Sequence, residues 1–343
     1  MLRQAYIFAR KASATTMQET NDASTGEGQQ APNWHPRANW LETPQPIEAE
    51  RFAALPDEFR QPRRSRWGDV NAGGRSLHSF LEGPSFDREG LLYVTDIPHG
   101  RVFSIDPQGR WRLVVEYDGW PNGLKIDRQG RIFIADYRRG ILMLDAKTGR
   151  VEPVVETWRS ESFKGVNDLC FASNGDLYFT DQGQTGLQDA TGRVFRWRDG
   201  QGLRCLIDTA PSPNGLCLNA DESQLYVAMT RANAIWRLPL MADGGVSKVG
   251  LYVQMSGGIG PDGIALDSEG GLAVAHPGTT AWRFDRFGMR THYAAYREEL
   301  FITNLAYGGP GLRDIYLVDS RRGEILRAAM PVAGRPLYSH AQP

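Results

Sequence analysis

The chain has almost no net charge and no long apolar run. Its 39 Lys and Arg residues nearly balance 40 Asp and Glu residues, so no basic excess exists to bind the phosphates of a nucleic acid. No window approaches the roughly 18 consecutive apolar residues of a membrane helix, and no apolar run follows the first basic residues as in a signal peptide. We therefore expect neither a nucleic-acid partner nor a membrane.

Cysteines and nucleophile motifs are also scarce. Cys170, Cys205 and Cys217 lie in strand-like runs without the spacing of metal ligands, which favours buried thiols in a cytoplasmic protein. The chain has no G-x-S-x-G motif, and its Gly-rich piece SGGIGPDG lacks a following helix. A serine nucleophile of the α/β-hydrolase type and a phosphate-binding loop are therefore not supported.

The first residues differ from the rest of the chain. The stretch MQETNDASTGEGQQAPN is polar and has no apolar period, so residues 1–45 are interpreted as a disordered lead-in and residues 46–343 as one domain. Residues 1–16 contain Arg3, Arg10 and Lys11 with no acid before Glu19. That pattern fits a transit peptide or a start codon upstream of Met17, and we favour the second interpretation.

Beyond residue 80 the sequence repeats. Six segments have the form strand, turn, strand, from LEGPSFDREGLLYVTD through VNDLCFASNGDLYFTD to ITNLAYGGPGLRDIYLVD, and further strand-like runs such as RVFSID follow them. The repeat length of 40 to 48 residues and four short strands per repeat predict an all-β, six-bladed β-propeller with antiparallel blades around a central channel. We expect RSLHSF, residues 75–80, to be the outer strand that closes the sixth blade.

One position of the repeat carries a side-chain oxygen in every segment. A hairpin places the start of its first strand beside the end of its second, so these residues should surround one mouth of the channel. They are Glu82, Asn122, Asn167, Asn214, Asp262 and Asn304. Taken singly each fits a turn or strand entry, but together they favour a site for a hard divalent cation. Ca²⁺ is the first expectation, Mg²⁺ and Mn²⁺ follow, and Zn²⁺ comes last because it usually recruits His or Cys.

These motifs carry a family resemblance. The chain from about residue 51 to 330 resembles the senescence-marker-protein, gluconolactonase and luciferin-regenerating family through LEGPSFD, KGVNDLCF, DLYFTD, PNGLCL, GPDGIALD and TNLAYGGPGLRDIYL. The resemblance implies a central divalent metal on Glu82, Asn214 and Asp262, with Asn167 as a fourth ligand or a substrate contact. It also implies hydrolysis of a small lactone or related ester.

Two departures from related patterns qualify that expectation. The related diisopropylfluorophosphatase branch has an acid and a histidine where this chain has Ala265 and Ala306, so phosphotriester hydrolysis remains only an alternative. In DLYFTDQGQTGL, residues 182–185 replace a Pro and a Tyr of the lactonase branch, which leaves the particular lactone open.

The loops at the same mouth offer further candidates. Second strands of the repeat end in Asp96, Asp136, Asp181, Met229, His276 and Asp319, where most of the Asp residues are expected to cap turns. We expect substrate contacts from Asn122, His99, Trp120, Tyr137, Gln182 and Arg231. For the general base Asp262 is the first candidate and His276 the second. A non-enzymatic propeller held by a structural ion is the remaining alternative, and the sequence specifies no oligomeric state.

Overall fold

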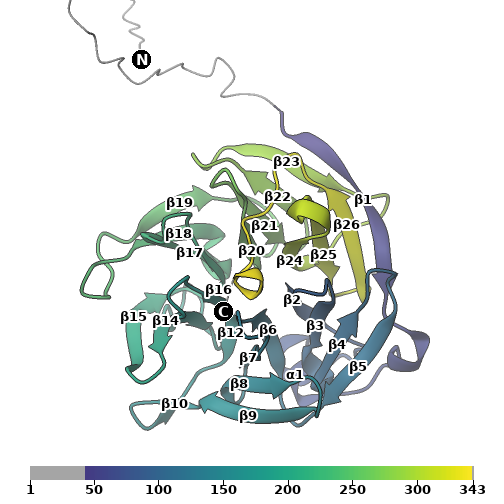
Figure 1. The fold of residues 1–343 in the computed structure, drawn as a ribbon, viewed down its shortest axis with the longest axis horizontal. Helices are drawn as coiled ribbons and strands as arrows, with labels where there is room; N and C mark the ends of the chain where they lie inside the picture. The colour runs from purple at the N-terminus through teal and green to yellow at the C-terminus, as the bar shows by residue number, and fades with distance from the viewer. Residues whose placement is uncertain (1–42, 342–343) are drawn as a thin grey trace, which may run out of the picture. The chain divides into compact units, whose positions relative to one another are not determined.

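The computed structural model describes residues 43–341. Nearly all of the expected lead-in, residues 1–45, and the question of a targeting segment therefore lie outside the described residues. Four sheets of four antiparallel strands follow one another along the chain (Figure 1). The first sheet contains β2 (Leu81–Phe86), β3 (Leu92–Asp96), β4 (Arg101–Ile105) and β5 (Trp111–Glu116), and the second contains β6 (Pro121–Ile126), β7 (Ile132–Asp136), β8 (Gly140–Asp145) and β9 (Arg150–Val155). The third contains β12 (Val166–Phe171), β13 (Leu177–Asp181), β14 (Gly192–Arg198) and β15 (Gly202–Ala210). The fourth contains β16 (Pro213–Leu218), β17 (Gln224–Met229), β18 (Ala234–Pro239) and β19 (Gly250–Gln254).

The remaining long strands form one eight-stranded sheet. Its order is β20 (Ile264–Leu266), β21 (Leu272–His276), β22 (Thr280–Phe284), β23 (Arg290–Ala295), β1 (Gln45–Ala54), β26 (Glu324–Ala329), β25 (Asp314–Asp319) and β24 (Ile302–Gly308). A short ribbon of β10 (Thr157–Trp158) and β11 (Glu161–Ser162) completes the described strands. The expected all-β, propeller-like fold is confirmed, but the sheets are four of four strands and one of eight instead of six separate blades.

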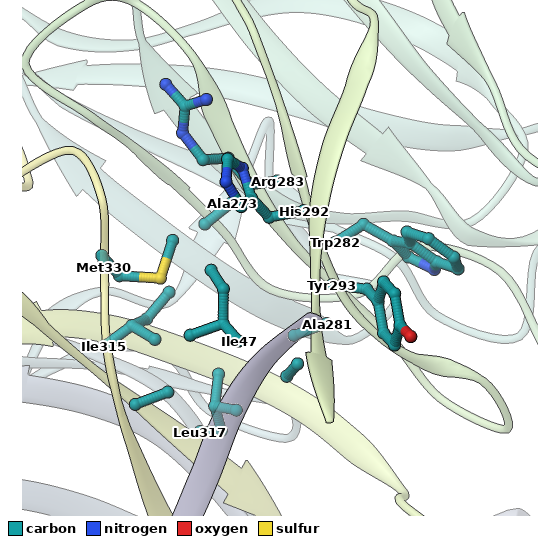
Figure 2. Close-up of a pocket in the computed structure, with 12 residues that line it drawn as sticks. Ile47, Ala273, Ala281, Trp282, Arg283, His292, Tyr293, Ile315, Leu317 and Met330 are labelled. Atoms are coloured by element: carbon teal, nitrogen blue, oxygen red, sulfur yellow. The ribbon is translucent and has the colours of Figure 1, made fainter. Parts of the chain in front are cut away.

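The prediction that residues 75–80 form the strand that closes the ring was wrong. β1 lies between β26, with which it pairs antiparallel, and β23, with which it pairs parallel. Residues 75–80 form no strand, and Leu77 instead makes an isolated bridge to Arg63. Apolar side chains explain the difference, because β1 carries Ile47 and Ala49 into the core of this sheet. Figure 2 shows Ile47 among Ala281, Ile315, Leu317 and Met330, beside a small cavity of about 20 Å³.

The inner strands share an irregularity near their beginning. The register of β2 with β3 shifts between Glu82 and Ser85, and equivalent shifts occur in β6, β12 and β16 after their first residue. At Gly83, with φ of 55°, a Cβ would lie 2.4 Å from the Asn122 carbonyl oxygen of the next sheet. A bulge in the ladder re-aims side chains, so these strands present their second residue to the channel instead of to a neighbouring strand.

Turns and short helices occupy the ends of the sheets. They are η1 (Asp57–Phe59), α1 (Arg66–Asn71), η2 (Ile97–His99), η3 (Thr230–Ala232), η4 (Pro310–Leu312) and η5 (Tyr338–His340). α1 has six residues, and within residues 43–341 no helix has the length and apolar character to cross a bilayer. All three cysteines are free thiols. η5 belongs to a C-terminal segment at the centre of the sheets, where Tyr338 stacks on Phe171 at 4.9 Å (Figure 1).

Candidate active site at the mouth of the channel

The starts of the inner strands open into one cavity of about 420 Å³. Eight predicted site residues line it: Glu82, Asn122, Tyr137, Asn167, Gln182, Asn214, Arg231 and Asp262. His99, Trp120 and His276 do not line it, nor does Asn304 of the repeat position. The structure thus brings together five of the six side-chain oxygens of the repeat, from five different inner-strand segments.

Four strand-end aspartates bind backbone amides just before or at the start of an inner strand. Asp96 accepts a hydrogen bond from the Phe80 backbone N–H at 2.7 Å, and Asp181 accepts one from Gly165 at 2.8 Å. Asp136 and Asp319 do the same for Trp120 and Phe301. Each bonded amide lies two or three residues before a side-chain oxygen of the mouth. The aspartates were expected to cap turns, and the structure shows that they also position the site.

Glu82 is a buried carboxyl group that makes no salt bridge within residues 43–341. Its side-chain oxygen accepts hydrogen bonds from Asn304 Nδ2 at 2.8 Å and from its neighbour's backbone N–H, that of Gly83, at 3.1 Å. Burial raises the pKa of Glu82 to about 7, although these hydrogen bonds oppose the rise. Asn304 therefore holds Glu82 in place and is not itself part of the cavity wall.

Asp262 and Asn214 form the other half of the site. Burial, followed by the nearby carboxylates Glu82 and Asp168, raises the pKa of Asp262 well above its usual range. Asn214 Nδ2 donates to Thr230 Oγ1 at 3.2 Å, whereas the buried Asn214 Oδ1 has no hydrogen-bond partner among residues 43–341. An unpartnered buried amide oxygen beside two repelling carboxyl groups is the electrostatic environment that a bound cation would relieve.

Asn167 is oriented by a polar chain from the neighbouring strand end. Its Nδ2 donates to Gln182 Oε1 at 2.9 Å, and Gln182 Nε2 donates to Ser212 Oγ at 3.0 Å. With its amide nitrogen bonded to Gln182, Asn167 can offer its Oδ1 to the cavity. Gln182 was expected to contact substrate, and in the structure it also orients Asn167.

These residues fit a divalent cation with oxygen ligands. Glu82 and Asp262 supply two negative charges, and Asn214 and Asn167 supply neutral amide oxygens. Within the part of the chain that the structure describes, no three His, Cys, Asp or Glu residues gather as a metal cluster. The donor set is thus half amide and half carboxylate, which suits Ca²⁺ better than Zn²⁺.

His276 is placed differently from the expectation for a base. It is 1% exposed, its Nε2 lies 3.0 Å from Asn233 Oδ1, and its Nδ1 lies 2.7 Å from Thr279 Oγ1. Burial lowers the pKa of His276. Both ring nitrogens are engaged away from the cavity, so the imidazole supports the loop that contains Asn233.

The other aromatic and basic candidates lie around the rim. The rings of Trp120 and Tyr137 are 5.8 Å apart, and Tyr137 OH accepts a hydrogen bond from Gln184 at 2.9 Å. His99 Nε2 lies 2.9 Å from the Leu77 carbonyl oxygen, so it holds the segment before β2. Arg231 belongs to η3 and lines the cavity.

Sequence reasoning missed a whole wall of the cavity. Residues 62–80, here called the mouth segment, contribute ten of the lining residues, including Trp67, Asn71 and Arg75. Ser65 accepts a hydrogen bond from the Gly68 N–H and so caps α1 within this segment. The serine ahead of RWGD is a helix-start signal that could have predicted α1, but no local pattern relates it to the mouth of the channel. Thr230 and Thr303 also line the cavity and were not anticipated.

A propeller-like arrangement with acid and amide oxygens at the start of its inner strands defines a class of protein, and comparison with known proteins identifies the family. Residues 80–321 match the SMP-30/gluconolactonase/LRE-like region, so the chain belongs to this family. A lactonase, drp35 of Staphylococcus aureus, is 30% identical over 219 residues, which are 61% of this chain and 66% of the relative. The match therefore spans slightly less than two thirds of that relative's length.

Solved structures of other proteins have a similar fold. A gluconolactonase from Xanthomonas campestris has a TM-score of 0.66 and 23% identity, covering 85% of this chain and 99% of the other. A calcium-binding protein, regucalcin, from Agrobacterium tumefaciens has a TM-score of 0.69 and 21% identity, covering 87% and 99% of the two chains. At these identities the likeness shows the fold alone.

Proposed function

We propose that the protein is a hydrolase that opens the ring of a small lactone with the help of a divalent cation, Ca²⁺ in the first instance. The observation that carries the proposal is the unpartnered Asn214 Oδ1 beside Glu82 and Asp262 at an open cavity. A relative named lactonase and a similar structure named gluconolactonase support the reaction class. A similar structure described as calcium-binding supports the cation.

The proposal includes a six-bladed architecture. In the eight-stranded sheet, β20 to β23 and β24 to β26 with β1 would each be one blade of four strands, joined by the parallel pairing of β1 with β23. That division places the Asp262 segment and the Asn304 segment in different blades, as the repeat requires.

Glu82, Asn214 and Asp262 would hold the cation, with Asn167 as the fourth protein ligand. When bound, the cation would supply Lewis-acid polarisation of the lactone carbonyl. Asp262 is the proposed general base because the residue is partly exposed and lines the cavity, whereas Glu82 is only 3% exposed. Asn122, Tyr137, Gln182 and Arg231 remain proposed substrate contacts.

In the proposed reaction, water adds to the carbonyl carbon while Asp262 takes one of its protons. The ring C–O bond then breaks, and the departing alkoxide takes the proton back from Asp262, which gives the free hydroxy acid and restores the Asp262 carboxylate. No side chain forms a covalent bond to substrate in this scheme. Trapping with hydroxylamine should therefore yield no acyl-enzyme.

Ring opening can be followed by proton release over a panel of five- and six-membered lactones. Protein stripped with chelator should be inactive, and adding Ca²⁺, Mg²⁺, Mn²⁺ or Zn²⁺ separately should identify the effective ion. Asp262→Asn should abolish turnover and weaken binding of the cation, because it removes one of two anionic ligands. Failure of every lactone and ion would reject the hydrolase, and a cation-dependent rise in melting temperature alone would favour a non-enzymatic role.

His276 provides a separate test of the base. We expect His276→Gln to keep turnover within a few-fold of wild type, because its ring nitrogens are bonded to Asn233 and Thr279. A loss of about 100-fold in turnover with unchanged cation affinity would instead assign the proton transfer to the imidazole.

A further inference from the structure

The mouth segment is built into the cavity but lies ahead of the family match, which begins at residue 80. An antiparallel bridge between Arg63 and Leu77 ties its two ends together, and the Trp67 ring packs 4.8 Å from Phe80. Gln184 Nε2 donates to Asn71 Oδ1 at 3.0 Å and so joins the segment to the far rim. The family match therefore does not include this wall, whose residues must be interpreted from their own contacts.

The cavity wall carries an excess of positive charge. Among residues 43–341, three arginines line it, Arg75, Arg231 and Arg321, together with two acids, Glu82 and Asp262. Arg231 makes no hydrogen bond or salt bridge with any residue in the range 43–341. Arg75 uses only its Nε, which donates to the Ala72 carbonyl at 3.0 Å. Two guanidinium groups are thus left with most of their donors available.

Hydrogen bonds of Thr230 and Asn233, on either side of Arg231 in the chain, fix the position of its backbone. Thr230 Oγ1 donates to the Pro261 carbonyl at 2.8 Å and accepts from Asn214 Nδ2, which ties η3 to the cation site. Asn233, with φ of 50°, ends η3 and is held by His276 and by a 2.8 Å hydrogen bond to the Gly257 carbonyl. Arg231 is therefore presented at a defined place near Asp262, where its positive charge acts on that carboxyl group, and it makes no hydrogen bond or salt bridge within residues 43–341.

A bound dication would change the balance further. Glu82 and Asp262 are the groups that would neutralise it, so no lining carboxylate would then remain to offset Arg75 and Arg231. Arg321 already pairs with Glu299 at 3.6 Å. Arginines whose N–H donors are free in a cavity donate them to water or to an anionic group of the ligand. Guanidinium groups bind carboxylate and phosphate oxygens through paired, charge-assisted hydrogen bonds.

We propose that the substrate carries an anionic group, a carboxylate or a phosphate ester, in addition to its lactone ring, and that Arg231 and Arg75 bind this group. The inference rests on the proposed lactonase function for the reacting end of the substrate. His276 acts in it as a positioning residue, because it holds Asn233 and through it the turn that bears Arg231.

The kinetic test compares three sugar lactones that share one ring. One bears a terminal carboxylate, one a terminal phosphate ester and one a plain hydroxymethyl group. Wild type should favour a charged lactone by about 10- to 100-fold in KM, the effect expected of charge-assisted hydrogen bonds. Arg231→Gln should remove most of that preference through KM with little change in kcat, and the better charged substrate would distinguish carboxylate from phosphate.

Matched variants separate binding from general charge effects. Arg290→Gln, on β23 and outside the cavity lining, should leave the preference intact. His276→Gln should raise KM for the charged lactone more than for the uncharged one, which a merely structural defect would not do. Equal hydrolysis of charged and uncharged lactones by wild type would overturn the inference.

A binding measurement keeps the inference testable without turnover. Lactams with the same substituents are opened much more slowly than the lactones. Their affinity can therefore be measured by calorimetry with Ca²⁺ present. If no lactone is hydrolysed but the anionic lactams bind at least tenfold more tightly than the neutral one in an Arg231-dependent way, the lactonase proposal fails and the anion site stands. If all lactams bind alike, the anion site is rejected whatever the hydrolysis result.

Discussion

Replacing Asp181 by Asn tests whether the strand-end aspartates hold the site together. Asp181 is fully buried, and its second oxygen accepts from Arg193 Nε at 2.7 Å while the first accepts from Gly165. Arg193 is only 5% exposed, so losing the carboxylate leaves a buried guanidinium charge without its partner. Breaking such a pair costs about 3 to 5 kcal/mol of unfolding free energy. That is a large part of the 5 to 15 kcal/mol that typical domains possess.

The variant should also weaken the cation site. Gly165 lies two residues before Asn167, so a loosened strand start misplaces a proposed ligand. Urea unfolding in chelator would measure the stability loss, and the shift of melting temperature on Ca²⁺ titration would measure the change in affinity. Arg193→Met added to Asp181→Asn should restore part of the stability, because no unpaired charge then remains buried.

Asp267 offers a matched control at the other end of an inner strand. It is 1% exposed, accepts from Arg283 Nε at 2.9 Å, and bonds the turn amides of Glu269 and Gly271. Asp267→Asn should therefore cost similar stability with little change in cation affinity. The reasoning is refuted if Asp181→Asn costs less than about 1 kcal/mol, or if both variants change cation affinity equally.

Three further outcomes are expected. Ile47→Ala should lower the unfolding free energy by about 2 kcal/mol in urea titrations, because this side chain packs β1 against the core of the eight-stranded sheet. Tyr338→Ala should cost about 2 to 3 kcal/mol in the same assay, since it removes the stacking on Phe171 and the acceptor for Arg128 Nε; an unchanged midpoint would show that the C-terminal segment adds nothing. The lowered pKa of His276 means that its contribution to stability is present above the ordinary value of 6.5 and is lost as pH falls through the folded pKa. His276→Gln should flatten that part of the pH profile relative to wild type.

The repeat predicted the mouth well because its signal is local. Each side-chain oxygen stands at the start of a strand, a turn such as that at Gly90 or Gly130 follows, and hairpin geometry then determines which ends meet. Glu82, Asn122, Asn167, Asn214 and Asp262 accordingly line one cavity. The burial of Asn214 Oδ1 was not readable from the sequence, since it depends on neighbours from other sheets.

Contacts between residues that are far apart in the chain could not be predicted from the sequence. β1 and residues 75–80 both precede the first repeat, and only packing against β23 and β26 selects β1 as the closing strand. The same holds for His276, whose partner Asn233 lies 43 residues earlier in the chain. A strand-end histidine indicates a base or a structural group equally well until its hydrogen-bond partners are known.

Departures from the repeat, more than the repeat itself, mark the chemistry. Four strand ends carry the anchoring Asp, and the two exceptions are Met229 and His276, on either side of the Asp262 segment. There Thr230 bonds both Asn214 and Pro261 in place of a strand-end carboxylate. An aspartate at Met229 or His276 would bring another negative charge close to Asp262, where Glu82 and Asp168 already raise the carboxyl pKa. Neutral side chains at these two strand ends therefore leave two carboxyl groups, Glu82 and Asp262, in the cavity lining, the number that the proposed dication would neutralise.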